Sequence, residues 1–149
     1  MSVKFPKTPP ADWASPRYIG TPWVWGGSTP LTGFDCAGFL HWAWTHDFGV
    51  ALPDWQGQQT EGSKTHRSKQ SRDLIHHYLG GCRKIDRPVN GAGVLMKRAT
   101  IPNHVGLYSG GDVVHACEIA GEVIRERMED LTPKIVGFYV PSQTWTDPS

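Results

Sequence analysis

The sequence predicts an α+β fold in which helices from the first half of the chain pack on an antiparallel β-sheet from the second half. Three observations support this prediction. The first half contains two segments with helical spacing of apolar residues, the second half contains five short strand-like segments, and a Gly110-Gly111 pair joins two of them. Runs of helix followed by runs of strand are typical of this class.

The first helix is predicted to begin after Asp35, which is a good N-cap residue. Apolar residues then recur at spacings of three and four and form one stripe: Cys36, Phe39, Leu40, Ala43 and Trp44. Such a stripe buries one face of a helix against a core. The helix is expected to end near Phe48 and Gly49.

The second helix is predicted to begin after Ser71 and to end at Gly80-Gly81, because glycine stops helices. Its buried residues are expected to be Leu74, Ile75, Tyr78 and Leu79. The polar segment 56–70 is predicted to be a loop. The basic stretch 64–72 is interleaved with Ser and His, and a solvated loop is the interpretation we favour for it.

The strands are predicted at residues 94–97, 104–108, 113–117, 122–125 and 135–140. A chain of 149 residues fits one domain, so 1–149 is predicted to be a single unit. Within it, residues 1–11 are expected to form an extended arm and residues 144–149 a short tail.

A two-residue turn at Gly110-Gly111 fixes which side chains share a face of the hairpin. It pairs Ser109 with Asp112 and, counting back, Gly106 with His115 and His104 with Cys117. Side chains alternate along a strand, so one face carries His104, Gly106, Tyr108, Val113, His115 and Cys117. His104 and His115 are then diagonal neighbours, close enough for their rings to meet. The alternative is a pair of half-exposed strand histidines.

Composition excludes several classes of function. The formal net charge is +1 and the basic residues are scattered, which argues against a nucleic-acid partner. No apolar run approaches the roughly 18 residues of a membrane span. Three cysteines do not suggest a disulfide framework. The first residues lack the apolar run of a secretory signal, so synthesis in the cytoplasm is expected.

Cys36 is the candidate nucleophile. At a helix N-terminus, the helix dipole and unpaired N–H groups favour an anion and should lower the pKa of a thiol. The same N–H groups can hold a developing oxyanion. The alternative is a small buried core residue, since Cys36 begins the apolar stripe. Gly38, one turn into the helix, costs about 1 kcal/mol against Ala, which suggests that another segment packs tightly there.

Several motifs in order resemble the NlpC family of papain-like cysteine peptidases. They are Pro22-Trp23-Val24-Trp25-Gly26-Gly27, Gly33-Phe34-Asp35-Cys36-Ala37-Gly38-Phe39, Leu52-Pro53, Gln59, Asn103-His104-Val105-Gly106-Leu107-Tyr108 and Val114-His115-Ala116. The resemblance covers residues 18–140. It implies a papain-like fold with the nucleophile at a helix N-terminus.

The resemblance also implies roles for individual residues. Cys36 would be the nucleophile, His104 its base and His115 the residue that orients the base. Substrate contacts are expected from Trp23, Trp25, Gly26, Asp35 and Ala37. The implied substrate is a peptidoglycan stem peptide, typically cut between D-glutamate and a diamino acid. No metal or other cofactor is expected.

This chain departs from the usual family pattern at four places. Trp23 stands where the family usually has Tyr, and it offers an N–H donor but no hydroxyl. Ala37 replaces a common Ser. The family's Gly-Asp turn is absent around residues 91–94, and the hairpin turn is about one residue shorter than is common.

Other functions remain open at this level. Members of the family carried in phage tails or gene-transfer particles are similarly small, so a place in a tail tip, with tail-tip proteins as partners, is expected. The alternatives are a structural tail subunit with vestigial catalytic residues and a cytosolic amidase or acyltransferase with the same Cys–His chemistry. A zinc site from His76, His77, Cys82, His115 and Cys117 is disfavoured, because the spacing matches no structural site.

Overall fold

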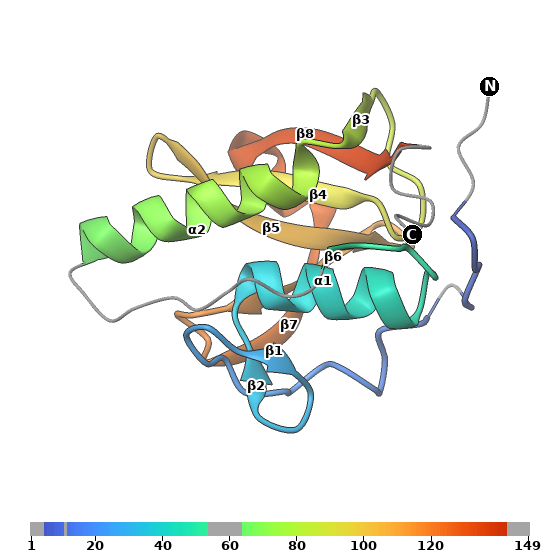
Figure 1. Ribbon diagram of the computed structural model, residues 1–149, viewed down its shortest axis with the longest axis horizontal. Coiled ribbons are helices and arrows are strands. Elements are labelled where there is room, and N and C mark those ends of the chain that lie inside the picture. Colours follow the sequence, from blue (N-terminus) through green and yellow to red (C-terminus); the bar gives the residue numbers. More distant parts are fainter. Residues whose placement is uncertain (1–4, 11, 54–63, 143–149) are drawn as a thin grey trace.

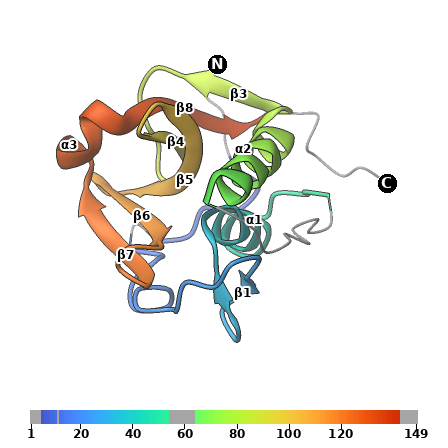
Figure 2. The ribbon, with the colours of Figure 1, turned by 90° about the vertical axis from the view of Figure 1, so that its left-hand side faces the viewer.

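The computed structural model describes residues 5–10, 12–53 and 64–142. Its centre is a six-stranded antiparallel sheet in the order β3-β8-β4-β5-β6-β7. The strands are β3 (Cys82–Ile85), β4 (Gly93–Arg98), β5 (Ile101–Ser109), β6 (Asp112–Cys117), β7 (Glu122–Arg127) and β8 (Ile135–Pro141). All five predicted strands are confirmed, and β3 is an addition. Two helices lie along one side of this curved sheet (Figures 1 and 2).

Helix α1 (Cys36–His46) begins where the sequence predicted and ends two residues before the predicted end near Phe48 and Gly49. Asp35 is its N-cap, and the predicted apolar stripe is buried throughout. Helix α2 (Lys64–Leu79) begins earlier than predicted. The prediction of a loop is therefore wrong for residues 64–70, where Arg, Lys and Gln, all good helix formers, extend the helix away from the core.

The small elements lie around the sheet. Strands β1 (Ser28–Thr29) and β2 (Gly33–Phe34) form a two-stranded hairpin before α1. Helix α3 (Met128–Leu131) and the 3₁₀ turn η1 (Thr132–Lys134) connect β7 to β8. These short elements were not predicted from the sequence, because they are too short for any periodic pattern.

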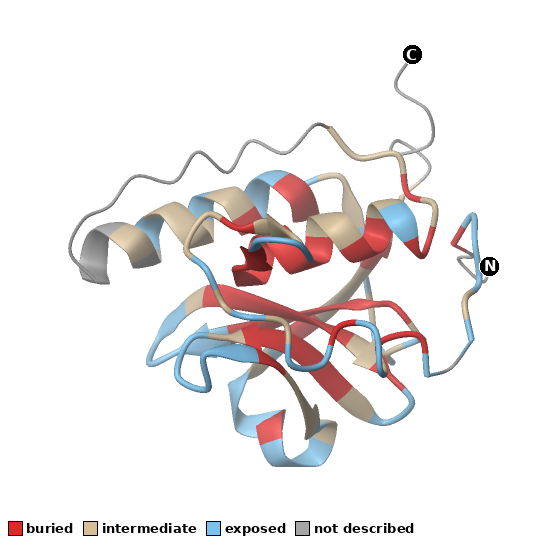
Figure 3. Ribbon diagram, turned by 90° about the horizontal axis from the view of Figure 1, so that it is seen from below, coloured by how far each residue is buried: buried red, intermediate tan, exposed pale blue. Residues whose placement is uncertain are grey.

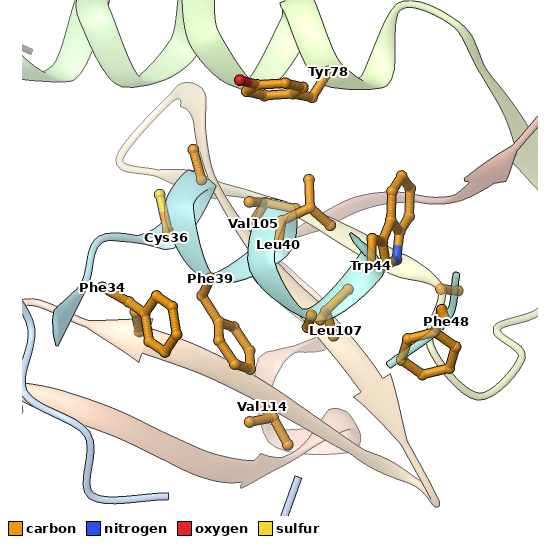
Figure 4. Packing of buried hydrophobic residues seen from close by; sticks show 14 of the residues in the cluster. Phe34, Cys36, Phe39, Leu40, Trp44, Phe48, Tyr78, Val105, Leu107 and Val114 are labelled. Atoms are coloured by element: carbon orange, nitrogen blue, oxygen red, sulfur yellow. The ribbon is translucent and has the colours of Figure 1, made fainter. Parts of the chain in front are cut away.

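The main core lies between α1 and the sheet (Figures 3 and 4). Val105, Leu107, Val114 and Ala116 point into it from β5 and β6, as the hairpin parity predicted. Phe5, in the predicted arm, also belongs to it, because its ring packs 4.8 Å from that of Phe48. The described part of the arm is therefore anchored to the core at Phe5.

A second, smaller apolar cluster covers the opposite face of the sheet. It contains Val94, Met96, Val113 and Leu131, the last from α3. Both faces of the central strands are thus covered at this end of the sheet. In the part of the chain that the structure describes, the helices are all too short or too polar to cross a lipid bilayer.

Candidate active site

The N-terminus of α1 is built on tight backbone packing. Asp35 Oδ1 accepts a hydrogen bond from Gly38 N–H (2.8 Å), and Asp35 Oδ2 accepts one from Gly26 N–H (3.0 Å). A Cβ on Gly38 would lie 1.9 Å from the carbonyl oxygen of Gly27. The close packing predicted from Gly38 is therefore confirmed, and it fixes the loop before Cys36 against the first turn of the helix.

Cys36 is only 5% exposed, at the edge of the main core (Figure 4). Burial, with a further contribution from the Asp35 carboxylate, raises the pKa of Cys36 to about 12. Arg98 and the backbone N–H groups of Val105 and Ala37 act in the opposite direction. The expected lowering of this pKa is wrong for the resting protein, because desolvation outweighs these favourable contacts.

The β5–β6 hairpin places a backbone donor beside this sulfur. Gly110 and Gly111 both have positive φ (55° and 94°), which suits the predicted two-residue turn. Pairing runs from Ser109–Asp112 to Leu107–Val114 in the predicted register, and the described ladder stops before it reaches the predicted pairs of Gly106 with His115 and His104 with Cys117.

Two observations show where the backbone N–H of Val105 is directed beyond the end of this ladder. Tyr108 N–H points to Ala92 on the β4 side, so the alternating N–H of Val105 points to the β6 side. It bonds the sulfur of Cys36 there. The end of the ladder therefore opens the hairpin toward the start of α1.

Four side chains form a continuous chain of hydrogen bonds at the open end of the hairpin. Arg98 Nη2 lies 3.1 Å from His104 Nδ1, His104 Nε2 lies 2.8 Å from His115 Nδ1, and His115 Nε2 lies 2.9 Å from Glu126 Oε1. A guanidinium only donates and an ionised carboxylate only accepts. With neutral imidazoles, both histidines therefore carry their proton on Nε2, and the lone pair of His104 is on Nδ1.

The pKa values of both histidines are lowered, which supports these neutral forms. Burial is the main cause for each ring, and the cation of Arg98 adds to it. For His115, the hydrogen bond and charge of Glu126 oppose the shift. The prediction of a hydrogen bond between His104 and His115 is confirmed, and the alternative of half-exposed rings is wrong, since each residue is 5% exposed.

A group of aromatic and charged side chains lies beside these hydrogen-bonded residues. The rings of Trp23 and Trp25 stack 6.5 Å apart, and the Arg67 guanidinium of α2 lies 4.6 Å from the Trp25 ring centre. Arg67 also pairs with Glu118 (3.1 Å), which lies 3.9 Å from Arg98. This group is therefore linked through Arg98 to the hydrogen-bonded pair His104 and His115.

A sequence model of the NlpC/P60 family matches residues 20–134, which is most of the chain and includes Cys36, His104 and His115. The chain belongs to the NlpC/P60 family. The resemblance predicted from the ordered motifs is thereby confirmed.

The chain is similar to curated proteins over shorter stretches. It is 37% identical over 67 residues to the bifunctional muramidase/DL-endopeptidase CwlT of Bacillus subtilis (strain 168), covering 44% of this chain and 20% of that protein. It is 46% identical over 43 residues to the gamma-DL-glutamyl hydrolase of the same strain, covering 29% and 10%. To the murein DD-endopeptidase MepH of Escherichia coli (strain K12) it is 46% identical over 37 residues, covering 25% and 14%. The chain thus spans a fifth or less of these relatives.

Solved structures support the fold. An NlpC/P60 family protein from Bacillus cereus has a TM-score of 0.59 and 21% identity, with 90% of this chain and 40% of that chain covered. The P60 domain of an antigen from M. avium subspecies paratuberculosis has a TM-score of 0.56 and 21% identity, with 88% and 93% covered. The predicted α+β, papain-like fold is confirmed.

Among the NlpC/P60 positions predicted to bind substrate, Trp23, Trp25 and Gly26 are half-buried and accessible. Asp35 and Ala37 are 2% and 1% exposed. Both carboxylate oxygens of Asp35 hold backbone N–H groups, so its side chain organises the loop, and direct contact of either residue with substrate stays a prediction. The motif residue Gln59 lies outside the described residues.

Glu126 and Arg98 were not predicted from the sequence as site residues. Glu126 pairs with Val113, and Ile124 pairs with His115, so Glu126 shares the face of His115. The same alternation rule would have found it, but the strand was predicted to end one residue earlier. Arg98 follows a register shift between Met96 and Arg98, which no periodic pattern reveals.

Within the described residues the three cysteines form no disulfide bond, and Cys82 and Cys117 are half-buried. Within the described ranges, no three His, Cys, Asp or Glu side chains gather in a way that would hold a metal ion. The imagined zinc ligands His76 and His77 are exposed on α2, whereas His115 is occupied by His104 and Glu126.

Proposed function

We propose that this domain is a cysteine peptidase that cleaves an amide bond in peptidoglycan stem peptides, typically between D-glutamate and a diamino acid. The observation that carries the proposal is the single direction of donation along the hydrogen bonds from Arg98 to Glu126. Glu126 and His115 hold the Nε2–H tautomer of His104, which leaves its Nδ1 lone pair as the base. Cys36 receives the backbone N–H of the next residue, Val105.

In this mechanism the thiol of Cys36 is activated only as it reacts. Its raised pKa keeps the resting sulfur protonated. The sulfur attacks the carbonyl carbon while its proton passes to His104 Nδ1. The new imidazolium is stabilised through His115 by the Glu126 carboxylate. Breaking the C–N bond then releases the amine, which takes the proton from His104 and leaves a thioester on Cys36.

Water completes the cycle. His104 removes a proton from the water as it attacks the thioester carbon, and the thiol leaves with that proton. The backbone N–H of Cys36 is at the first position of α1, where it has no intrahelical acceptor. It is a donor for the negative oxygen that develops in both halves of the reaction.

The relatives support the substrate class more than the bond. Their names describe a DL-endopeptidase, a gamma-DL-glutamyl hydrolase and a DD-endopeptidase. Each acts on a peptide link that contains a D-residue, but the links differ. Cleavage next to D-glutamate is therefore the bond that we propose among the peptide bonds that contain a D-residue.

Incubation of the purified chain with defined muropeptides, followed by mass spectrometry, tests the function and the bond together. We expect products cut after the γ-carbonyl of D-glutamate, and no products with a Cys36→Ala variant. Products cut between two D-residues would overturn the choice of bond. If wild type and Cys36→Ala both leave every muropeptide intact, the vestigial alternative is favoured.

We also propose, from the sequence resemblance alone, that the domain acts at the cell wall as part of a phage-like tail tip. Its partners there would be tail-tip proteins. Fractionation of induced cultures on a density gradient, with detection of this chain by mass spectrometry, tests the proposal. Recovery with the particles is expected, and recovery only as free protein would contradict it.

A further inference from the structure

Arg98 is aimed at the site by two local irregularities of the backbone. The β4–β5 ladder shifts register between Met96 and Arg98, and Arg98 then pairs with Ile101 across a two-residue turn. Ala99 in that turn has a φ of 54°, a conformation that residues other than Gly, Asn and Asp seldom adopt. A bulge beside a tight turn re-aims the side chain that it carries.

The guanidinium occupies the lone pair that the reaction needs. Arg98 Nη2 donates to His104 Nδ1, and the other ring nitrogen of His104 is held by His115. While this bond lasts, Nδ1 cannot accept the proton of Cys36. The cation also opposes the imidazolium form of His104. The described arrangement is therefore a resting state in which the base is blocked.

The ion pairing of Arg98 is weak enough to be exchanged. Its carboxylate partner is Glu118, with 3.9 Å between Arg98 Nη1 and Glu118 Oε1. Glu118 makes its shorter pair with Arg67, at 3.1 Å. The Arg98 side chain is 44% exposed, so water screens the pair and leaves it worth little. A carboxylate that presents both oxygens to the guanidinium would form a better pair.

We propose that Arg98 is a specificity-determining residue that binds a free carboxylate of the substrate near the scissile bond and thereby releases His104. This inference rests on the proposed function and deepens it. A D-glutamate joined through its γ-carboxyl keeps its α-carboxylate free, one glutamyl side chain away from the reacting carbonyl. When that α-carboxylate is a carboxamide, as in D-isoglutamine, the substrate has no negative charge there. Arg98 then remains hydrogen-bonded to Nδ1 of His104.

The test compares two substrates that differ only in this group. They are L-alanyl-γ-D-glutamyl-meso-diaminopimelate and its counterpart with D-isoglutamine. For wild type we expect kcat/KM to be about 10-fold or more higher with the free carboxylate, because a site built for a polar group rejects an analogue that lacks it.

Arg98→Gln should move the two substrates in opposite directions. With the carboxylate substrate, kcat/KM should fall, because the ion pair is lost. With the carboxamide substrate, kcat should rise above wild type, because the base is no longer blocked. A residue that only supports the fold would lower both rates together, and that outcome, or equal wild-type rates on both substrates, would overturn the proposal.

Two further variants make the comparison specific. Arg98→Lys keeps the charge without the paired donors, so part of the preference for the carboxylate should remain. Arg87→Gln removes the same charge from an exposed position between β3 and β4, and it should leave the ratio of the two substrates unchanged. A shift with Arg87→Gln as large as that with Arg98→Gln would assign the effect to net charge and overturn the role of Arg98.

Binding keeps this inference separate from the proposed function. Titration of a Cys36→Ala variant with each peptide, followed by NMR, should show tighter binding of the carboxylate peptide. Adding Arg98→Gln should remove the difference. If wild type cleaves neither peptide but this difference is present, the peptidase proposal fails and the role of Arg98 stands. Equal binding of the two peptides to Cys36→Ala would sink the role of Arg98.

Discussion

The two ends of the β5–β6 hairpin are made of the same strands but have different properties. At the turn end, Gly110 and Gly111 close a regular ladder, and Val113 packs in the apolar cluster beneath α3. At the open end the ladder has stopped, His104 and His115 bond to each other, and the N–H of Val105 reaches Cys36.

The difference shows how chemistry arises where regular pairing ends. In a regular ladder each backbone N–H that faces the partner strand is satisfied by it, so none is left for another group. Once the ladder stops, a backbone donor becomes available to another group, here the sulfur of Cys36. The buried polar side chains must then satisfy one another, and they do so as a chain with one direction of donation.

The largest expected effect comes from removing the reacting groups at the open end. Cys36→Ser and His104→Ala should each lower muropeptide cleavage by at least about 1000-fold, because the nucleophile and the base act as a unit. The melting temperature of Cys36→Ser should stay close to wild type, since the change is nearly isosteric. A large fall in that temperature would favour the alternative that Cys36 is chiefly a core residue.

Removing the orienting ring should have a smaller effect. His115→Ala should lower kcat/KM by roughly 10- to 1000-fold, because His104 keeps its proton-transfer role but loses the bond that fixes its tautomer. Steady-state kinetics on the same muropeptide would measure the loss. Full activity in His115→Ala would reduce the site to a Cys–His dyad.

Each end of the hairpin contains a glycine, so the two ends can be tested separately. A Cβ on Gly106 would lie 2.6 Å from Val113 Cγ1 and 3.0 Å from His115 Cβ, so Gly106→Ala should cost about 1–3 kcal/mol of stability and also lower activity. Gly110→Ala meets no atom within 4 Å, and its positive φ should cost about 1–2 kcal/mol with activity unchanged.

Urea unfolding and kinetics on the two glycine variants would check this pair. Loss of activity in Gly110→Ala equal to that in Gly106→Ala would show that the two ends are not independent.

A variant of Glu126 tests whether the series of hydrogen bonds from Arg98 extends as far as this carboxylate. Glu126→Gln keeps an acceptor for His115 Nε2–H but removes the charge, and the residue is 38% exposed on its side chain. Activity should fall by less than about tenfold, since a solvated charge contributes little. The pKa of His115 should also fall, because Glu126 raises it. NMR titration of the His115 ring would measure that shift. An unchanged pKa would show that Glu126 does not act on His115 through this hydrogen bond.

The smallest effect is on the pH dependence. The pKa of His104 is lowered below the usual 6.5, so His104 stays a neutral base in mildly acidic solution and the acid limb of kcat/KM should lie below pH 6.5. Stability has the matching sign. Between the two pKa values the unfolded chain binds protons that the folded chain does not, so the free energy of unfolding should fall as pH drops through about 6.5.

Thermal unfolding at pH 7.5 and 5.5 would check this sign. The difference in melting temperature should be smaller in a His104→Gln, His115→Gln double variant. An equal difference in wild type and double variant would show that other groups carry it.

Particular residues show how much of this was predictable. Asp35 and the apolar stripe behind it predicted the start and the buried face of α1, because capping and helical spacing are local. Gly110-Gly111 predicted the turn, the faces of β5 and β6, and the meeting of the histidines, because alternation is also local. Helix α2 was predicted too short, since its first turns carry no apolar stripe.

Local sequence patterns are enough to show which residues share a helix turn or a strand face, and therefore which side chains are available to the site. Three features follow instead from the packing of distant segments: the end of the β5–β6 ladder, the raised pKa of Cys36, and the hydrogen bond from Arg98 to the Nδ1 lone pair of His104. The physical reason is range. Capping and alternation act between neighbours in the chain, whereas desolvation and hydrogen bonds between strands depend on which distant segments pack together.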